Sequence, residues 1–248
     1  MMAPSSLVRQ VGLITAEPTP TLLSVVAYRN LDFVVLDAEQ TTLTLQQCAD
    51  AVQRLSGAIT RVAVRVPDLD DMTLVAFANT GVDEIVLPRV RRPEELECAY
   101  RATRFGPGGT RPRQASFASA FGADYSLEPR LTVLFETVEA VDAVEDFVAL
   151  ECFDGGWVGP TDLAGELLKR GRPGAGALDE SVQRVVDVLG AAGQSVGLPA
   201  ADIASAGDVH ARGADRAAVY WERELASMIA QLAAAGAPET HWKRYDSL

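Results

Sequence analysis

The chain has 248 residues, 48% of them hydrophobic, and a formal net charge of −12 at pH 7. The apolar content suffices for one large core, and the acidic charge argues against nucleic acid or an anionic membrane surface as a partner. The sequence has neither an apolar run of about 18 residues nor a basic start followed by an apolar segment, the patterns of a membrane span and an export signal. We therefore predict a cytoplasmic protein.

Segments with strand character alternate with segments of helical character along the chain. The expected strands are residues 11–15, 32–38, 60–66, 84–90, 130–136, 156–159, 195–199 and 216–221. The expected helices are residues 19–30, 44–56, 71–80, 93–104, 138–150, 179–192, 203–212 and 223–235. This alternation predicts an α/β fold with a parallel sheet, and eight units favour a closed (β/α)8 TIM barrel over an open sheet. No linker divides the chain, so we predict one domain over residues 1–248.

Two connecting segments, residues 106–128 and 164–178, are longer than simple turns require. Loops of this length in a compact domain are usually functional or disordered. The segment 164–178 follows a strand end, so we expect it at the end of the barrel where the strands finish. The segment 106–128 leads into a strand, which places it at the opposite end. Its arginines, Arg111 and Arg113, are expected to be solvated surface charges.

Two carboxylates follow neighbouring strands at the end where the strands finish. Glu136 comes directly after a buried apolar run, and Asp162 comes shortly after the next one. Two oxygen ligands with open positions suit Mg²⁺ or Mn²⁺, which keep water and substrate oxygens in their coordination shells. The chain has two histidines, so a zinc site with three histidine ligands is excluded. We therefore predict a divalent metal at Glu136 and Asp162.

Arg65 closes the third expected strand and would reach the same rim. A guanidinium there can bind a carboxylate through two hydrogen bonds and can stabilise the negative charge of an enolate. An ion pair with Asp37 or Glu39, from the second strand, is its alternative role, and the two roles do not exclude each other.

Backbone amides at Gly159, Pro160 and Thr161 would border the same rim, between the sixth strand and Asp162. A metal, an arginine and such a segment together describe a binding site for a 2-oxo acid. The metal would chelate the keto and carboxylate oxygens, and the arginine would support the enolate. We therefore predict a small 2-oxo acid as the substrate.

These segments resemble those of the metal-dependent 2-oxo acid aldolases of the HpcH/HpaI aldolase/citrate lyase family. The resemblance runs from Gly12 to about Gly236 and is carried by Leu36-Asp37-Ala38-Glu39-Gln40, Val64-Arg65, the segment Arg101 to Arg111, Phe135-Glu136-Thr137 and Val158-Gly159-Pro160-Thr161-Asp162-Leu163. It implies a (β/α)8 barrel, a divalent metal on Glu136 and Asp162, and Arg65 at the enolate. It also implies a homo-oligomer, commonly a hexamer, in which a C-terminal helix (here about residues 223–248) is exchanged between subunits.

The chain departs from the family pattern in its proton-handling residues. Gln40 stands where the aldolases carry a catalytic histidine, and Asn79 stands where they carry the aspartate that partners it. Amides of similar size cannot exchange a proton near neutral pH. At the eighth strand, Trp221 and Glu222 replace the usual residues, and we expect Trp221 to line the mouth of the site and Glu222 to be a candidate base.

Our first interpretation is a metal-dependent carbon–carbon lyase or synthase that acts through an enolate of a 2-oxo acid, with altered proton handling. Decarboxylation and condensation of a pre-formed enolate need no base at the outset, whereas aldol cleavage does. One alternative is a citrate-lyase-like enzyme that acts on an acyl-CoA, with Arg89, Arg91 and Arg92 as the nearest basic cluster for the CoA phosphates. The other is a catalytically reduced barrel kept as a binding or assembly subunit.

Overall fold

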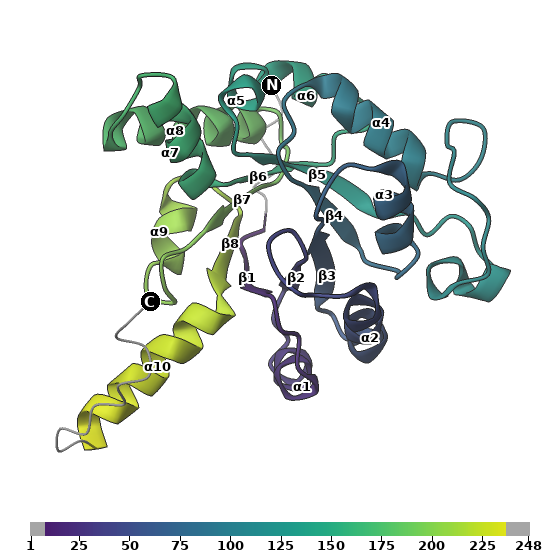
Figure 1. Cartoon of the computed structure of the whole chain (residues 1–248), viewed down its shortest axis with the longest axis horizontal. Helices are drawn as coiled ribbons and strands as arrows, with labels where there is room; N and C mark the ends of the chain where they lie inside the picture. Colours follow the sequence, from purple (N-terminus) through teal and green to yellow (C-terminus); the bar gives the residue numbers. More distant parts are fainter. Residues whose placement is uncertain (1–7, 237–248) are drawn as a thin grey trace.

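The computed structural model describes residues 8–236, and these residues form a closed barrel of eight parallel strands (Figure 1). The strands follow one another around the barrel in chain order, and β1 pairs with β8 to close it. They are β1 (Gln10–Thr15), β2 (Phe33–Asp37), β3 (Arg61–Arg65), β4 (Glu84–Leu87), β5 (Arg130–Phe135), β6 (Gly156–Val158), β7 (Val196–Pro199) and β8 (Arg216–Tyr220). The predicted (β/α)8 fold is confirmed.

Helices connect the strands on the outside of the barrel, and their apolar faces form the main core against it. They are α1 (Pro20–Tyr28), α2 (Leu45–Leu55), α3 (Asp71–Ala78), α4 (Pro93–Thr103), α5 (Val138–Asp142), α6 (Val144–Val148), α7 (Pro160–Lys169), α8 (Ala175–Ala191), α9 (Ala206–Ala211) and α10 (Trp221–Gly236), with a 3₁₀ turn, η1, at Phe117–Gly122. No helix within residues 8–236 combines the length and apolar character needed to span a bilayer.

Three element boundaries differ from the sequence-based expectation. The expected loop 164–178 is largely helical, because Leu163 and Leu167 lie one helical turn apart and are both buried under α7. The expected helix 138–150 is interrupted at Ala143, which separates α5 from α6. Trp221 begins α10 and does not continue β8.

Two aromatic rings fill the barrel interior, and each lies against a glycine of the neighbouring strand. Gly12 is paired in register with Phe33, and Gly197 is paired with Trp157. A Cβ atom at Gly12 would lie 2.3 Å from the Phe33 ring, and one at Gly197 would lie 2.3 Å from the Trp157 ring. The two rings pack edge to face, with their centres 5.6 Å apart. The rings therefore pack across the barrel because both glycines lack a side chain.

A buried ion pair closes the end of the barrel where the strands begin. Arg216 donates to both carboxylate oxygens of Glu84, at 3.0 and 2.7 Å. Thr132 and the Trp157 indole also donate to Glu84, at 2.8 and 3.0 Å. Burial by itself would raise the pKa of Glu84, but the Arg216 charge and these donors hold it below its usual value. Both oxygens of Glu84 thus accept hydrogen bonds, and the buried pair fills this end of the barrel and leaves the chemistry to the other end.

The segment 106–128 packs beneath the ends of α3 and α4, at the end of the barrel where the strands begin, as predicted. Arg111 corrects one expectation, because it is 4% exposed and not a solvated surface charge. It donates to the Asn79 side chain at 2.8 and 3.1 Å, and its guanidinium lies 4.1 Å from the centre of the Phe105 ring. Burial lowers the pKa of Arg111 to about 10.

Helix α10 leaves the barrel and extends away from it (Figure 1). The apolar side chains along it are exposed, namely Leu225, Met228, Ile229 and Leu232. A helix with such a row of exposed apolar residues is incompletely packed within one chain. The predicted tail beyond Gly236 lies outside the described residues.

We predict that Gly197→Ala lowers the free energy of unfolding by about 1–3 kcal/mol, because its methyl group would overlap the Trp157 ring. Urea denaturation of both proteins measures the change. Gly190→Ala, in α8 with open space around the added methyl group, is the matched control and should not destabilise. Equal stability of the two variants would show that the close packing of Trp157 against Gly197 is not required.

Candidate active site

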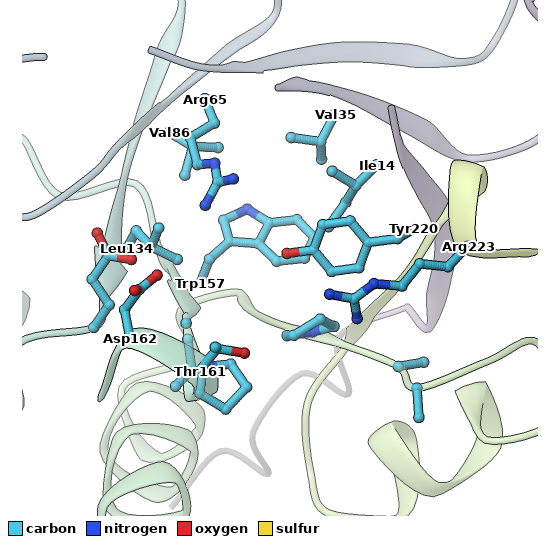
Figure 2. Close-up of a pocket in the computed structure, with 17 residues that line it drawn as sticks. Ile14, Val35, Arg65, Val86, Leu134, Trp157, Thr161, Asp162, Tyr220 and Arg223 are labelled. Carbon is cyan, nitrogen blue, oxygen red and sulfur yellow. The ribbon is translucent and has the colours of Figure 1, made fainter. Parts of the chain in front are cut away.

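A cavity of about 260 Å³ opens at the end of the barrel where the strands finish (Figure 2). Its apolar lining comes from the barrel interior and includes Ile14, Val35, Val86, Leu134 and Trp157. Its polar lining comes from strand ends and from the first turns of α7 and α10, and includes Arg65, Glu136, Thr161, Asp162, Tyr220 and Arg223. The cavity therefore combines an apolar floor with charged groups at the rim, the usual composition of a small-molecule site.

Glu136, directly after β5, is a deeply buried carboxylate at this rim, with an exposed fraction of 2%. Its Oε1 accepts a hydrogen bond from the backbone N–H of Arg89 at 2.6 Å. Burial raises the pKa of Glu136 to about 7. The Arg89 N–H and the Arg65 charge act against this rise, and the charges of Glu39 and Asp162 add to it. A buried carboxylate with this pKa near other carboxylates favours the arrival of a cation.

Gly159 allows the Glu136 side chain to occupy this position. A Cβ atom at Gly159 would lie 2.9 Å from Glu136 Cβ and 3.0 Å from Glu136 Oε2. Contacts this short require a shift of one group. The glycine after β6 therefore seats the carboxylate against the backbone at the start of α7.

Asp162 belongs to the first turn of α7, and not to the strand end where we expected it. Pro160 occupies the first helical positions, which fixes the start of the helix. The first backbone N–H groups of a helix lack intrahelical acceptors, so Thr161 and Asp162 add donors to the rim. Figure 2 shows the side chains of Arg65 and Asp162 pointing into the same cavity.

Arg65 forms the ion pairs that we considered as its alternative role, and it also lines the cavity. Its Nε and Nη2 donate to the two oxygens of Asp37 at 2.9 and 2.6 Å. Its Nη1 lies 3.1 Å from Glu39 Oε2. Burial by itself would lower the pKa of Arg65, but Asp37 raises it above its usual value. The guanidinium is thus charged and fixed in orientation at the rim.

The residues at this rim fit a divalent cation held by two carboxylates. No group of three or more His, Cys, Asp and Glu side chains within residues 8–236 is arranged to hold a metal. Glu39 is paired with Arg65 at 3.1 Å and with Arg89 at 3.2 Å, whereas Glu136 forms no ion pair within residues 8–236, so its negative charge is incompletely compensated. Mg²⁺ and Mn²⁺ accept two protein oxygens and complete their shells with water and substrate.

Gln40 and Asn79 do not meet within one chain. Gln40 is exposed and follows Glu39 in the segment after β2, at the end of the barrel that carries the cavity. Asn79 ends α3, at the opposite end, where it accepts the hydrogen bonds of Arg111. The two side chains lie apart in one subunit because a helix in a (β/α)8 barrel returns the chain to the far end. That they stand in place of a catalytic pair stays a prediction.

Trp221 and Glu222 lie outside the cavity, which corrects the expectation that they line its mouth. Both border a groove beside α1 on the outside of the barrel. Glu222 Oε1 accepts hydrogen bonds from Thr15 Oγ1 at 2.6 Å and from the Ala16 N–H at 3.0 Å, so it stabilises the segment after β1. Side chains alternate along a strand, and Tyr220, one residue earlier, is the residue that faces the cavity.

Tyr220 and Arg223 are site residues that the sequence reasoning did not assign, and Arg89 has a contact at the site other than the one considered for it. Arg89 adopts a positive φ of 53°, which turns its N–H toward Glu136. Its side chain pairs with Glu39 at 3.2 Å, and the Arg91 side chain pairs with Glu139 at 2.8 Å. Two of the three arginines considered for CoA phosphates are therefore engaged within the chain.

We predict that Gly159→Ala weakens Mg²⁺ affinity by about 10- to 100-fold, because the methyl group displaces the Glu136 carboxylate. Isothermal titration calorimetry measures the affinity. Gly165→Ala, in the same helix with open space around the added methyl group, should bind Mg²⁺ as the native protein does. Native affinity in Gly159→Ala would contradict the proposed position of the metal.

Comparison with known proteins identifies the family. Residues 10–227 match the HpcH/HpaI aldolase/citrate lyase family. A 5-keto-4-deoxy-D-glucarate aldolase from Escherichia coli (strain K12) is 30% identical over 196 residues, which cover 76% of this chain and 77% of the aldolase.

Solved structures agree with this fold. A family protein from Burkholderia cenocepacia J2315 has a TM-score of 0.82 at 23% identity, with 92% of this chain and 94% of that chain covered. Citrate synthase SbnG has a TM-score of 0.77 at 22% identity, with 92% and 93% covered. The family match spans all eight strands and the first turns of α10, and with them the whole cavity. The chain belongs to the HpcH/HpaI aldolase/citrate lyase family.

Proposed function

We propose that this protein is a divalent-metal-dependent carbon–carbon lyase or synthase that acts through an enolate of a 2-oxo acid. The observation that carries the proposal is the convergence of Glu136, Asp162 and Arg65 on one cavity with an apolar floor. Two carboxylates suit a hydrated divalent cation, and a fixed guanidinium suits the negative charge of an enolate. The 30% identity to a 5-keto-4-deoxy-D-glucarate aldolase supports carbon–carbon bond chemistry.

Glu136 and Asp162 are the residues that would hold Mg²⁺ or Mn²⁺. When bound, the ion would act as a Lewis acid on the keto and carboxylate oxygens of the substrate. Protein structures of the same fold include a citrate lyase β subunit from M. tuberculosis complexed with oxaloacetate and magnesium, at 18% identity and a TM-score of 0.58. That ligand pair is of the chemical class that the two carboxylates favour here.

Arg65 and the start of α7 would orient the 2-oxo acid. The two hydrogen bonds that Arg65 donates to Asp37 fix the guanidinium plane, so little reorganisation is needed when charge develops on the enolate oxygen. The N–H of Thr161, at the start of α7, is placed to donate to the substrate carboxylate. Pro160 has no N–H and contributes the shape of the turn, while Trp157 and the aliphatic floor exclude water.

The proton-handling groups favour reactions that begin without a base. The Gln40 amide cannot take up a proton near neutral pH, and the Glu222 carboxylate accepts hydrogen bonds from the segment after β1 outside the cavity. Decarboxylation of a 2-oxo-3-carboxy acid produces the enolate directly. Aldol cleavage needs a group to remove the substrate's hydroxyl proton, and such catalysis typically contributes about 10²–10⁴-fold. Decarboxylation or condensation is therefore the favoured chemistry.

A homo-oligomer accounts for two features that one chain leaves incomplete. The exposed apolar side chains of α10 need a partner surface, and Asn79 lies at the end of the barrel opposite Gln40. A second copy that packs against α10 and presents its own far end to the cavity would satisfy both. A hexamer and a cytoplasmic location stay predictions.

We predict that Gln40→His raises aldol cleavage of a 4-hydroxy-2-oxo acid by about 10²-fold or more, because an imidazole can exchange a proton near neutral pH. Oxaloacetate decarboxylation should change little, since its bond-breaking step starts without a base. Both reactions are measured with Mg²⁺ and with Mn²⁺ in the native protein and the variant.

The matched control is Gln46→His, which places the same ring on the exposed face of α2 and should leave both rates unchanged. If the native protein already cleaves the aldol as fast as Gln40→His does, the interpretation of Gln40 is wrong. The absence of both reactions in the native protein would overturn the proposed function.

A further inference from the structure

A second donor group lines the cavity on the side away from the carboxylates. Tyr220 ends β8, and Arg223 lies in the first turn of α10. Both residues line the cavity, and the Arg223 guanidinium lies 4.5 Å from the centre of the Tyr220 ring. Figure 2 shows the two side chains side by side across the cavity from Asp162. The stacking holds an otherwise exposed guanidinium at the rim.

Arg223 carries a positive charge that the described part of the chain does not neutralise. Arg65, the other arginine at the cavity, has Asp37 at 2.6 Å and Glu39 at 3.1 Å. Arg223 forms no ion pair and no hydrogen bond within residues 8–236, and its recorded contact is the Tyr220 ring. An arginine presented to a cavity in this way is available for an anion from outside the chain.

Tyr220 makes this side of the cavity a donor surface. Burial raises the pKa of Tyr220, so the hydroxyl keeps its proton near neutral pH and can donate a hydrogen bond. The Arg223 guanidinium also donates and cannot accept. A guanidinium beside a hydroxyl donor is complementary to an anionic group that accepts on several oxygens, of which a carboxylate is the simplest.

Apolar side chains separate this donor surface from the carboxylates. Ile14, Trp157 and Pro199 also line the cavity and offer no charged partner. A cavity of about 260 Å³ is slightly smaller than the roughly 300–1,000 Å³ of sites for drug-sized ligands. The ligand that fits is therefore small, with an uncharged middle and an acidic group at each end.

We propose that Arg223, stacked on Tyr220, is a specificity-determining residue that binds a second carboxylate at the end of the substrate remote from its 2-oxo acid group. The substrate class is then a dicarboxylic 2-oxo acid. The placement of the 2-oxo acid group of the substrate near Glu136 and Asp162 rests on the proposed function. The placement of the remote carboxylate rests on the unneutralised positive charge of Arg223 and on the hydrogen-bond donors of Tyr220 and Arg223 at the cavity.

Paired ligands that differ only in the remote group test this proposal by binding, without any need for turnover. The pairs are 2-oxoglutarate with 2-oxopentanoate and 2-oxoadipate with 2-oxohexanoate, each measured by calorimetry in the presence of Mg²⁺. We expect the native protein to bind the dicarboxylate of at least one pair about three- to tenfold more tightly, since the guanidinium is partly screened by water. Added salt should reduce this preference.

Variants assign the preference to Arg223. Arg223→Gln should lose it and retain native affinity for the monocarboxylates, while Tyr220→Phe should reduce it, because the ring remains and the hydroxyl donor is lost. Arg9→Gln removes an exposed arginine near the start of β1, at the far end of the barrel, and should keep the full preference.

The failure of this proposal is distinguishable from the failure of the proposed function. Equal affinity for the members of both pairs, or a preference that Arg223→Gln retains, overturns the role of Arg223 and leaves the 2-oxo acid site intact. If none of the four acids binds with Mg²⁺ present, the 2-oxo acid site itself is wrong and the role of Arg223 falls with it.

Discussion

The burial of the Glu136 carboxylate is the constraint on which the rest of the rim depends. The Arg89 N–H donates to it from the segment after β4, and Gly159 leaves room for it at the start of α7. Burial of a negative charge away from water is unfavourable in free energy unless a cation compensates the charge. Arg65 forms ion pairs with Asp37 and Glu39, so its positive charge mainly compensates those two carboxylates and not Glu136. The proposed divalent cation on Glu136 and Asp162 would resolve this imbalance.

The barrel interior decides which end carries the chemistry. Phe33 and Trp157 fill the middle, and the Glu84–Arg216 pair fills the end where the strands begin. The Glu84 carboxylate at that end accepts hydrogen bonds from Arg216, Thr132 and Trp157, whereas the polar groups at the opposite rim surround a cavity. The Trp157 side chain connects the two ends, because its indole N–H donates to Glu84 while its ring forms part of the cavity floor. Packing for stability and shaping of the site thus use the same residue.

The sequence predicted the features that depend on the order of the strands, namely the barrel and two residues of its rim. It did not predict the side-chain positions that depend on tertiary contacts. Buried runs rich in β-branched residues predicted the closed barrel and brought Arg65 and Glu136 to one rim. The sequence reasoning extended the eighth strand by one residue and so assigned Trp221 to the cavity in place of Tyr220. The alternation of side chains predicts which residues share a face of a strand, but it does not predict where the strand ends. Asn79 was assigned from the family resemblance, which does not by itself show that α3 carries it to the far end of the barrel. The Arg89 contact to Glu136 is made by the backbone and had no side-chain signal.

The central claim is that two carboxylates make this cavity a cation site, and a titration of metal stoichiometry tests it most directly. Native protein freed of metal by a chelator is titrated with Mn²⁺, and bound metal is counted per chain. One bound ion is expected in the native protein and in Glu180→Ala, which removes an exposed carboxylate of α8. Combined Glu136→Ala and Asp162→Ala substitution should abolish binding while the fold, followed by circular dichroism, is retained. A folded double variant that still binds one ion per chain would contradict the claim.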